Sequence, residues 1–294
     1  MKAIPRRMRL LLILFLLLSR AGFAYQLDSS LAMPGGVFLF SSPDGTEFSG
    51  GALLRRGKRV IASGEMFPQG EGYILLVPIP SDFEEPIARI ELLARDGDVT
   101  ELELPLRERS FITEEIPLNR SMSTLRRSDD PRKARESEHL WRVLSAFNHD
   151  AQIAALPLLL PVGEARKSSR FGDQRIFRYS DGAESRALHF GIDYAVPTGT
   201  PVRAPAEGRV VLAADRMTTG YTLVLEHGPG IYSLYYHLHA LNVEEGEPVD
   251  QGQVIAVSGS TGLSTGAHLH WELRINRIPV DPLLFLARPF IEAK

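Results

Sequence analysis

The sequence predicts a mainly β protein in which two β domains are joined by a charged, helical linker. Short apolar segments separated by Gly, Pro and Asp turns fill residues 25–118 and 156–294, whereas helical spacing of apolar residues is confined to residues 119–155. The chain has 294 residues, 44% of them hydrophobic, which is enough to build a core in each domain.

Residues 1–24 have the pattern of a signal peptide. Basic residues up to Arg9 precede an apolar run at 10–18, which is shorter than the ~20 residues of a spanning helix, and small residues lead to Ala24. We expect a periplasmic or otherwise exported protein that contacts the membrane only through this segment before cleavage. The alternative is that the segment is retained as an uncleaved anchor.

Residues 25–118 are expected to form a β-sandwich with an immunoglobulin-like outline. Glycine-containing turns at 42–45 and 96–97 separate segments in which polar and apolar residues alternate. No cluster of catalytic residue types occurs here, so we expect a separately folding accessory domain. The predicted strands are 37–40, 59–63, 73–77, 87–93 and 99–106.

The linker, residues 119–155, is expected to contain one helix that starts near Pro131. This helix would leave His139 and His149 near solvent, where we interpret both as residues without a metal-binding role. One apolar stripe is predicted to contain Leu140, Trp141, Val143, Leu144 and Phe147.

Residues 156–294 are expected to form an antiparallel β domain in which short strands are separated by tight turns. The predicted strands are 208–213, 222–226, 233–237, 254–257 and 268–275. The net charge of −3 makes nucleic acid an unexpected partner. Because the chain has no cysteine, any metal must be held by nitrogen and oxygen atoms.

Two histidines near the carboxyl end lie on one face of a predicted strand. His268 and His270 alternate with Leu269 and Trp271, and a strand places residues i and i+2 on one face about 6.6 Å apart. Their imidazoles therefore face a common cavity. Together with a remote His and Asp pair, this arrangement indicates a metal site rather than two structural histidines.

The remote pair is His189 and Asp193. Their spacing of four residues would suit a helix, but Gly191 and Pro197 disfavour one, so we expect a loop or strand start that bends both side chains toward the same ion. Two histidines and one carboxylate leave Zn²⁺ an open fourth position for water, whose pKa then falls from ~15.7 toward ~7.

These fragments resemble the lysostaphin-type zinc metallopeptidases, which cleave peptide bonds in bacterial peptidoglycan. The resemblance covers about residues 169–286. It implies that His189, Asp193 and His270 ligate Zn²⁺, and that His237 and His268 are catalytic residues that activate water or stabilise the oxyanion. All five positions are filled, as in active family members and unlike the degenerate ones that activate amidases.

Other residues near the predicted site remain alternatives. His239 has the same-face spacing from His237 and is its rival, although the resemblance favours His237 because it follows the tyrosine pair. His227, which precedes Gly228, is interpreted as a turn residue. Arg175 and the tyrosines Tyr235 and Tyr236 are candidates for lining a substrate groove, and packing explains the tyrosines equally well.

The predicted function is that of an exported zinc metalloendopeptidase whose partners are the peptide stems of peptidoglycan. A histidine is expected to be the base, because none of the eight histidines is followed by glutamate. The preferred substrate is a cross-link between D-alanine and diaminopimelate. The alternatives are a non-enzymatic module that binds the cell wall or activates amidases, and a periplasmic zinc carrier.

Overall fold

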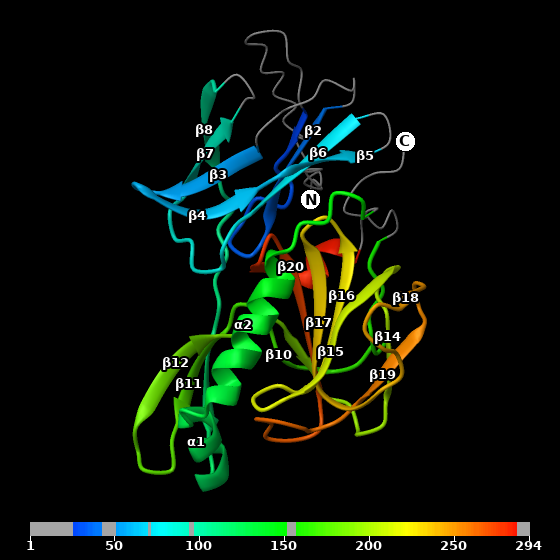
Figure 1. The fold of residues 1–294 in the computed structure, drawn as a ribbon. Helices are drawn as coiled ribbons and strands as arrows, with labels where there is room; N and C mark the ends of the chain where they lie inside the picture. Colours follow the sequence, from blue (N-terminus) through cyan, green and yellow to red (C-terminus); the bar gives the residue numbers. More distant parts are fainter. Residues whose placement is uncertain (1–25, 43–50, 70–71, 94–96, 152–156, 287–294) are drawn as a thin grey trace, which may run out of the picture.

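The computed structural model describes residues 26–42, 51–69, 72–93, 97–151 and 157–286 (Figure 1). The predicted signal peptide, most of the turn at 42–45 and residue 96 of the second turn lie outside these ranges. The predicted mainly β class is confirmed, with an amino-terminal β domain, a short helical part and a carboxy-terminal β domain. Within the described ranges, no helix is both long and apolar enough to cross a membrane.

Two four-stranded antiparallel sheets form the amino-terminal sandwich. Alternate side chains of both sheets, such as Phe38 and Ile90, bury one shared core, which is the physical basis of the predicted alternation. One sheet has the order β1 (Gln26–Asp28), β2 (Val37–Ser42), β6 (Gly72–Pro78) and β5 (Met66–Gln69). The other has the order β4 (Arg59–Gly64), β3 (Gly51–Arg56), β7 (Ile87–Leu93) and β8 (Val99–Pro105).

The sandwich is packed directly against the carboxy-terminal domain. Val37 and Leu76, on the outer face of the β1-β2-β6-β5 sheet, join the same buried cluster as Ile275 and Val280. The Asn276 side chain also donates a hydrogen bond of 3.1 Å to the Leu76 carbonyl. The two domains therefore share buried apolar surface, and separate folding of the amino-terminal domain stays a prediction.

The chain between the domains contributes to the carboxy-terminal domain. Strand β9 (Thr113–Pro117) pairs in parallel with β11 (Gln174–Arg178), which pairs with β12 (Glu184–Leu188). Residues 113–117 fall in the range assigned to the sandwich, yet they lie in a sheet with strands from beyond residue 173. Parallel pairing at this separation has no local sequence signal.

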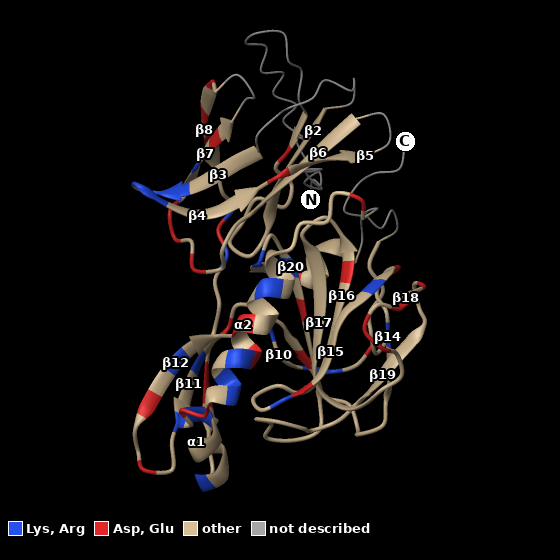
Figure 2. Cartoon of the chain, viewed as in Figure 1, with Lys and Arg blue, Asp and Glu red and all other residues tan. Residues whose placement is uncertain are grey.

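The linker contains two helices, α1 (Arg120–Arg127) and α2 (Pro131–Ser145), of which only the second was expected. Asp130 caps α2, since its carboxylate accepts from the Arg132 amide at 2.7 Å. Helix α2 crosses the carboxy-terminal sheet (Figure 1) and packs Leu144 into a cluster with Tyr232 and Tyr236. Lys, Arg, Asp and Glu occupy its outer surface (Figure 2).

Two details of the linker bear on the predictions. His139 and His149 are exposed, as expected, although His149 lies beyond the end of α2. Trp141 is not part of the buried stripe, because its side chain is 56% exposed. The guanidinium of Arg277 stacks over its ring at 5.1 Å, so a cation–π contact takes the place of core packing.

The carboxy-terminal sheet is antiparallel, as predicted, and holds the candidate site. Its buried side includes Leu269, Trp271 and Leu273, which alternate with the site residues along one strand. The main order is β10 (Lys167–Ser169), β13 (Ile192–Tyr194), β20 (Leu269–Ile275), β17 (Ile231–Leu241), β16 (Gly220–Gly228), β15 (Gly208–Arg216) and β18 (Pro248–Val249). Three further strands, β14 (Pro201–Arg203), β19 (Val254–Ser258) and β21 (Ile278–Val280), join it, and a 3-10 helix follows at Pro282–Phe285.

Candidate metal centre

Three adjacent strands place the central residues of the site side by side. His270 on β20 lies directly opposite Asp193 on β13 and opposite Tyr236 on β17. Cross-strand neighbours share a face of the sheet, so these three side chains point to the same side. The Tyr236 and His270 rings are stacked, with centroids 5.0 Å apart and an interplanar angle of 3°. Tyr236 thus supports the His270 ring instead of facing a groove.

His189 reaches the site from the bend between β12 and β13, as the sequence predicts. Gly191 lies at this bend, and a Cβ there would come within 2.4 Å of the Trp271 carbonyl oxygen. Glycine is therefore required for the loop to pass so close to β20. The result is that the His189 and His270 rings lie 4.9 Å apart between their centroids.

The nitrogen and oxygen atoms of the predicted ligand set converge. His189 Nε2 lies 3.2 Å from Asp193 Oδ1 and 3.0 Å from His270 Nδ1, and the last two atoms are 2.7 Å apart. All three residues are buried, and their candidate ligand atoms lie within 4.8 Å of one another. Within the described ranges this is the group whose geometry could hold a metal ion.

The outer nitrogen of each histidine is held by an acceptor. His189 Nδ1–H donates to the Arg170 carbonyl at 2.7 Å, and His270 Nε2–H donates to Glu272 Oε1 at 3.1 Å. A carbonyl or carboxylate can only accept, so these contacts assign the protons and leave His189 Nε2 and His270 Nδ1 facing the site. Glu272 is itself bound by Arg274 at 2.7 Å.

The electrostatics of the group are those of a cation site. Burial lowers the pKa of His189. Burial also disfavours charge on His270, but hydrogen bonds with Asp193 and Glu272 raise its pKa to about 9. Burial alone would raise the pKa of Asp193, but the contacts with both histidines hold this pKa well below its usual value. The Asp193 carboxylate is thus negatively charged, and it lies beside the Arg175 guanidinium and beside His270, whose place as a cation a metal ion can take.

This donor set fits Zn²⁺. Two imidazole nitrogens and one carboxylate oxygen are the ligands that a catalytic zinc site uses. The hydrogen bonds from the outer nitrogens of His189 and His270 are of the kind that orient such ligands. The fit rests on the converging atoms His189 Nε2, Asp193 Oδ1 and His270 Nδ1.

His237 and His268 flank this group. Their rings lie 4.7 Å apart between centroids, and His268 Nε2 lies 3.9 Å from Asp193 Oδ1. His237 Nδ1–H donates to the Thr261 carbonyl and His268 Nδ1–H to the Gly266 carbonyl, both at 2.8 Å. In the neutral form of each ring the proton is therefore on Nδ1, and Nε2 is the nitrogen that can accept. Burial lowers the pKa of His237 to about 3, so its ring is neutral at neutral pH.

A change in backbone conformation separates His237 from its rival. His237 has φ of +61°, and the pairing of β16 with β17 shifts register between Tyr221 and Leu223. This irregularity breaks the alternation that would have placed His239 on the same face as His237 and made it an alternative catalytic residue. His239 is exposed, whereas His237 is buried beside the site. Strand spacing alone did not distinguish the two residues, because it assumes a regular strand.

His227 and Tyr235 are both core residues. His227 lies inside β16 and not in a turn, and its ring contacts the Glu207 carbonyl at 2.7 Å and Ser233 Oγ at 2.6 Å. Tyr235 is fully buried, with its hydroxyl 2.7 Å from Ser233 Oγ. Packing therefore explains Tyr235, and neither residue reaches the candidate site.

Arg175 lies beside Asp193 and does not line the predicted substrate groove. Its guanidinium forms a hydrogen-bonded ion pair with Asp193 Oδ2 and lies 3.6 Å from the Glu114 carboxylate. Glu114 also accepts from Ser169 Oγ at 2.7 Å. Glu114 comes from β9, so no local pattern could have linked it to the site. Glu272, by contrast, continues the i, i+2 alternation of His268 and His270 and was detectable from the sequence.

The candidate site lies in a part of the chain that is similar to known proteins. Residues 187–282 match the model of peptidase family M23. The chain is 44% identical over 123 residues, 42% of its length, to the DD-carboxypeptidase/endopeptidase Mpg of Neisseria meningitidis serogroup B. It is 37% identical over 118 residues, 40% of its length, to the peptidoglycan DD-endopeptidase ShyA of Vibrio cholerae. The chain spans 27% of the length of either relative.

A solved structure extends the similarity to most of the chain. The crystal structure of a candidate M23 peptidase from Pseudomonas aeruginosa aligns with a TM-score of 0.62 at 26% identity. The alignment covers 88% of this chain and 96% of that protein. The arrangement of a β domain, a helical part and a carboxy-terminal β domain is thus shared with a known protein.

Proposed function

We propose that the chain is a zinc metalloendopeptidase that hydrolyses peptide cross-links of bacterial peptidoglycan, on the basis of the match of residues 187–282 to the model of peptidase family M23. The convergence of His189 Nε2, Asp193 Oδ1 and His270 Nδ1 is the observation that carries the proposal. A wall-binding module would have no need for these atoms, and a zinc carrier would have no need for His237 and His268 beside them.

Each site residue has a distinct role in the proposed reaction. His189, Asp193 and His270 would hold Zn²⁺, which supplies Lewis-acid chemistry by polarising a carbonyl and acidifying water. The rings of His237 and His268 lie 4.7 Å apart between centroids, and because each Nδ1–H donates to a carbonyl, Nε2 of the neutral ring is the atom that can accept a proton. An imidazole in this state accepts a proton from attacking water and returns one to the leaving nitrogen as the C–N bond breaks.

Two outer pairs keep the ligands in place. Glu272, which is paired with Arg274, accepts the Nε2–H of His270. Burial alone would raise the pKa of Glu272, but the charge of Arg274 lowers it to about 2. Arg175 holds the second oxygen of Asp193, so Oδ1 is the oxygen left for a metal. Preorganisation of this kind lowers the cost of assembling the site.

The proposed substrate is a cross-link between D-alanine and diaminopimelate. Relatives named as DD-endopeptidases support this class of bond, as does the similarity of the catalytic domain to them. We also propose that the protein acts outside the cytoplasmic membrane, because basic, apolar and small residues follow one another in export order over residues 1–24.

The test uses purified sacculi that contain diaminopimelate cross-links. The zinc-loaded protein should release fragments with a new D-alanine carboxyl group and a new diaminopimelate amino group, detected by mass spectrometry, and a chelator should abolish the release. His239→Ala is the matched control, since His239 is exposed and lies outside the ligand group. Binding to sacculi without any hydrolysis by the zinc-loaded protein would support the wall-binding alternative instead.

A further inference from the structure

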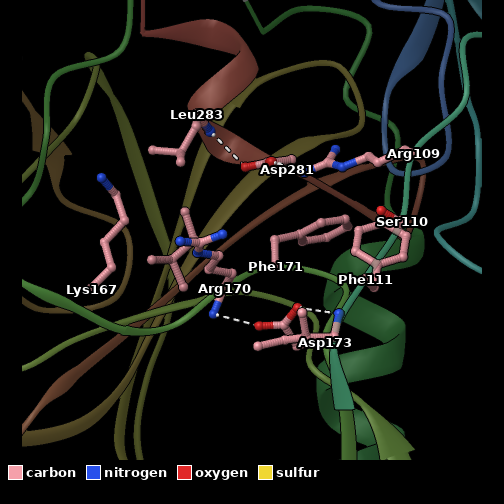
Figure 3. Close-up of a pocket in the computed structure, with 11 residues that line it drawn as sticks. Arg109, Ser110, Phe111, Lys167, Arg170, Phe171, Asp173, Asp281 and Leu283 are labelled. Carbon is pink, nitrogen blue, oxygen red and sulfur yellow. Dashed lines mark hydrogen bonds and ion pairs between the residues drawn. The ribbon is translucent and has the colours of Figure 1, made fainter. Parts of the chain in front are cut away.

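A cavity lies between the segment that follows the sandwich and the carboxy-terminal domain. It has a volume of about 440 Å³, which is in the range of small-molecule sites. Residues 109–112, which follow the sandwich, form one wall, and residues of the carboxy-terminal domain form the others, among them Lys167, Arg170 and Phe171 (Figure 3). It lies outside the proposed catalytic machinery, since none of the five site residues lines it.

The acidic residues of this cavity are already bound. Asp173 accepts from the Ile112 and Arg170 amides, each at 3.2 Å. Asp281 accepts from the Leu283 amide at 3.0 Å and forms an ion pair with Arg109. These contacts satisfy both carboxylates, so they have little capacity left for a bound cation.

Two of the three basic residues are not bound. Arg109 is held by Asp281 and lies over the Phe111 and Phe171 rings, at 5.1 and 5.6 Å. Lys167 and Arg170, in contrast, make no side-chain hydrogen bond or ion pair with any residue in the described ranges. Both are exposed, and Figure 3 shows them on the same side of the cavity.

Apart from Ser110, the remaining lining is apolar. Phe111 and Phe171 meet edge to face with centroids 6.4 Å apart, and Ile192 and Leu283 complete this surface. Three cations and two carboxylates line the cavity, which leaves one net positive charge. A monoanion is favoured over a dianion here, because the two carboxylates repel the second negative charge.

We infer that this cavity binds a small carboxylate with an apolar body, the class that includes the carboxyl end of a short peptide. Lys167 and Arg170 contact the carboxylate, while the half-buried Phe111 and Leu283 pack against the apolar part. The cavity adjoins the segment that supports the metal centre, since the Arg170 carbonyl accepts from His189. The inference does not depend on the proposed hydrolysis.

The test is calorimetric titration of the zinc-loaded full chain with N-acetyl-alanyl-alanine, with its carboxamide and with inorganic phosphate. We expect the free acid to bind at least 10-fold more tightly than the amide, because a charge-assisted hydrogen bond is lost. Phosphate should also bind more weakly than the free acid. Binding of phosphate as tight as that of the acid would show a general anion site and overturn the inferred ligand class.

Variants distinguish this cavity from the metal centre. Arg170→Gln and Lys167→Gln should each weaken binding of the acid about 10-fold or more while zinc content stays unchanged. Arg186→Gln is the matched control, because Arg186 is also exposed but lies outside the cavity. Unchanged affinity in both cavity variants, or loss of binding on removal of zinc alone, would place the acid at the metal centre and refute the inference.

Discussion

His268 and His270 stand two residues apart, yet their replacement by alanine should have different consequences. His270 Nδ1 lies 2.7 Å from Asp193 Oδ1 and 3.0 Å from His189 Nε2, whereas His268 Nε2 lies 3.9 Å from the same Asp193 oxygen. The candidate ligand atoms of His189, Asp193 and His270 all lie within 4.8 Å of one another, and His268 is not part of this group. We therefore expect His270 to bind the metal and His268 to remain outside its coordination shell.

The magnitudes follow from these two roles. Zinc sites with four protein ligands contribute about 10–16 kcal/mol, or about 3 kcal/mol per ligand, so His270→Ala should weaken zinc binding by about 10²- to 10³-fold. His268→Ala leaves the three converging atoms intact and should keep zinc affinity within a few-fold of the parent. Its rate of hydrolysis should fall by about 10²- to 10⁴-fold, the usual contribution of a general acid or base.

Metal affinity and activity should be measured separately. Competition with a chromophoric chelator gives the zinc affinity of each variant, and release of cross-link fragments under saturating zinc gives the rate. His239→Ala serves as the control for loss of an exposed imidazole on the same strand as His237. If His268→Ala lost zinc while His270→Ala retained it, the assignment of ligand and catalytic roles would be reversed.

Three further outcomes are expected. Glu272→Gln should weaken zinc binding about 10- to 100-fold, because it weakens the hydrogen bond that orients His270 through its Nε2–H. Competition with the chromophoric chelator measures this change. Burial lowers the pKa of His227 to about 4, against ~6.5 in the unfolded chain, so unfolding takes up a proton as the pH falls. The free energy of unfolding should therefore drop by about 3 kcal/mol between pH 6.5 and 4, and urea titrations of His227→Gln should lack this component. A fragment of residues 151–294 lacks β9 and α2, so it should unfold at lower urea concentration than residues 110–294; equal midpoints would contradict the packing of these elements.

Features that depend on neighbours along the chain could be predicted from the sequence. Alternation with period two located β7 and β8 of the sandwich, since one face of each of these strands is buried. The same alternation placed His268 and His270 on one face, and both approach Asp193. Helix α2 starts where Asp130 and Pro131 predict, because an N-cap acts on the amides that immediately follow it.

Tertiary structure alone decided which residues far apart in the chain meet. The positive φ of His237 turns its ring toward the site and leaves His239 exposed, which regular strand spacing cannot predict. Glu114 reaches Arg175 because β9 pairs in parallel with β11 across about sixty residues. Such pairings depend on the total burial and hydrogen bonding of the folded chain, so they cannot be predicted from local periodicity.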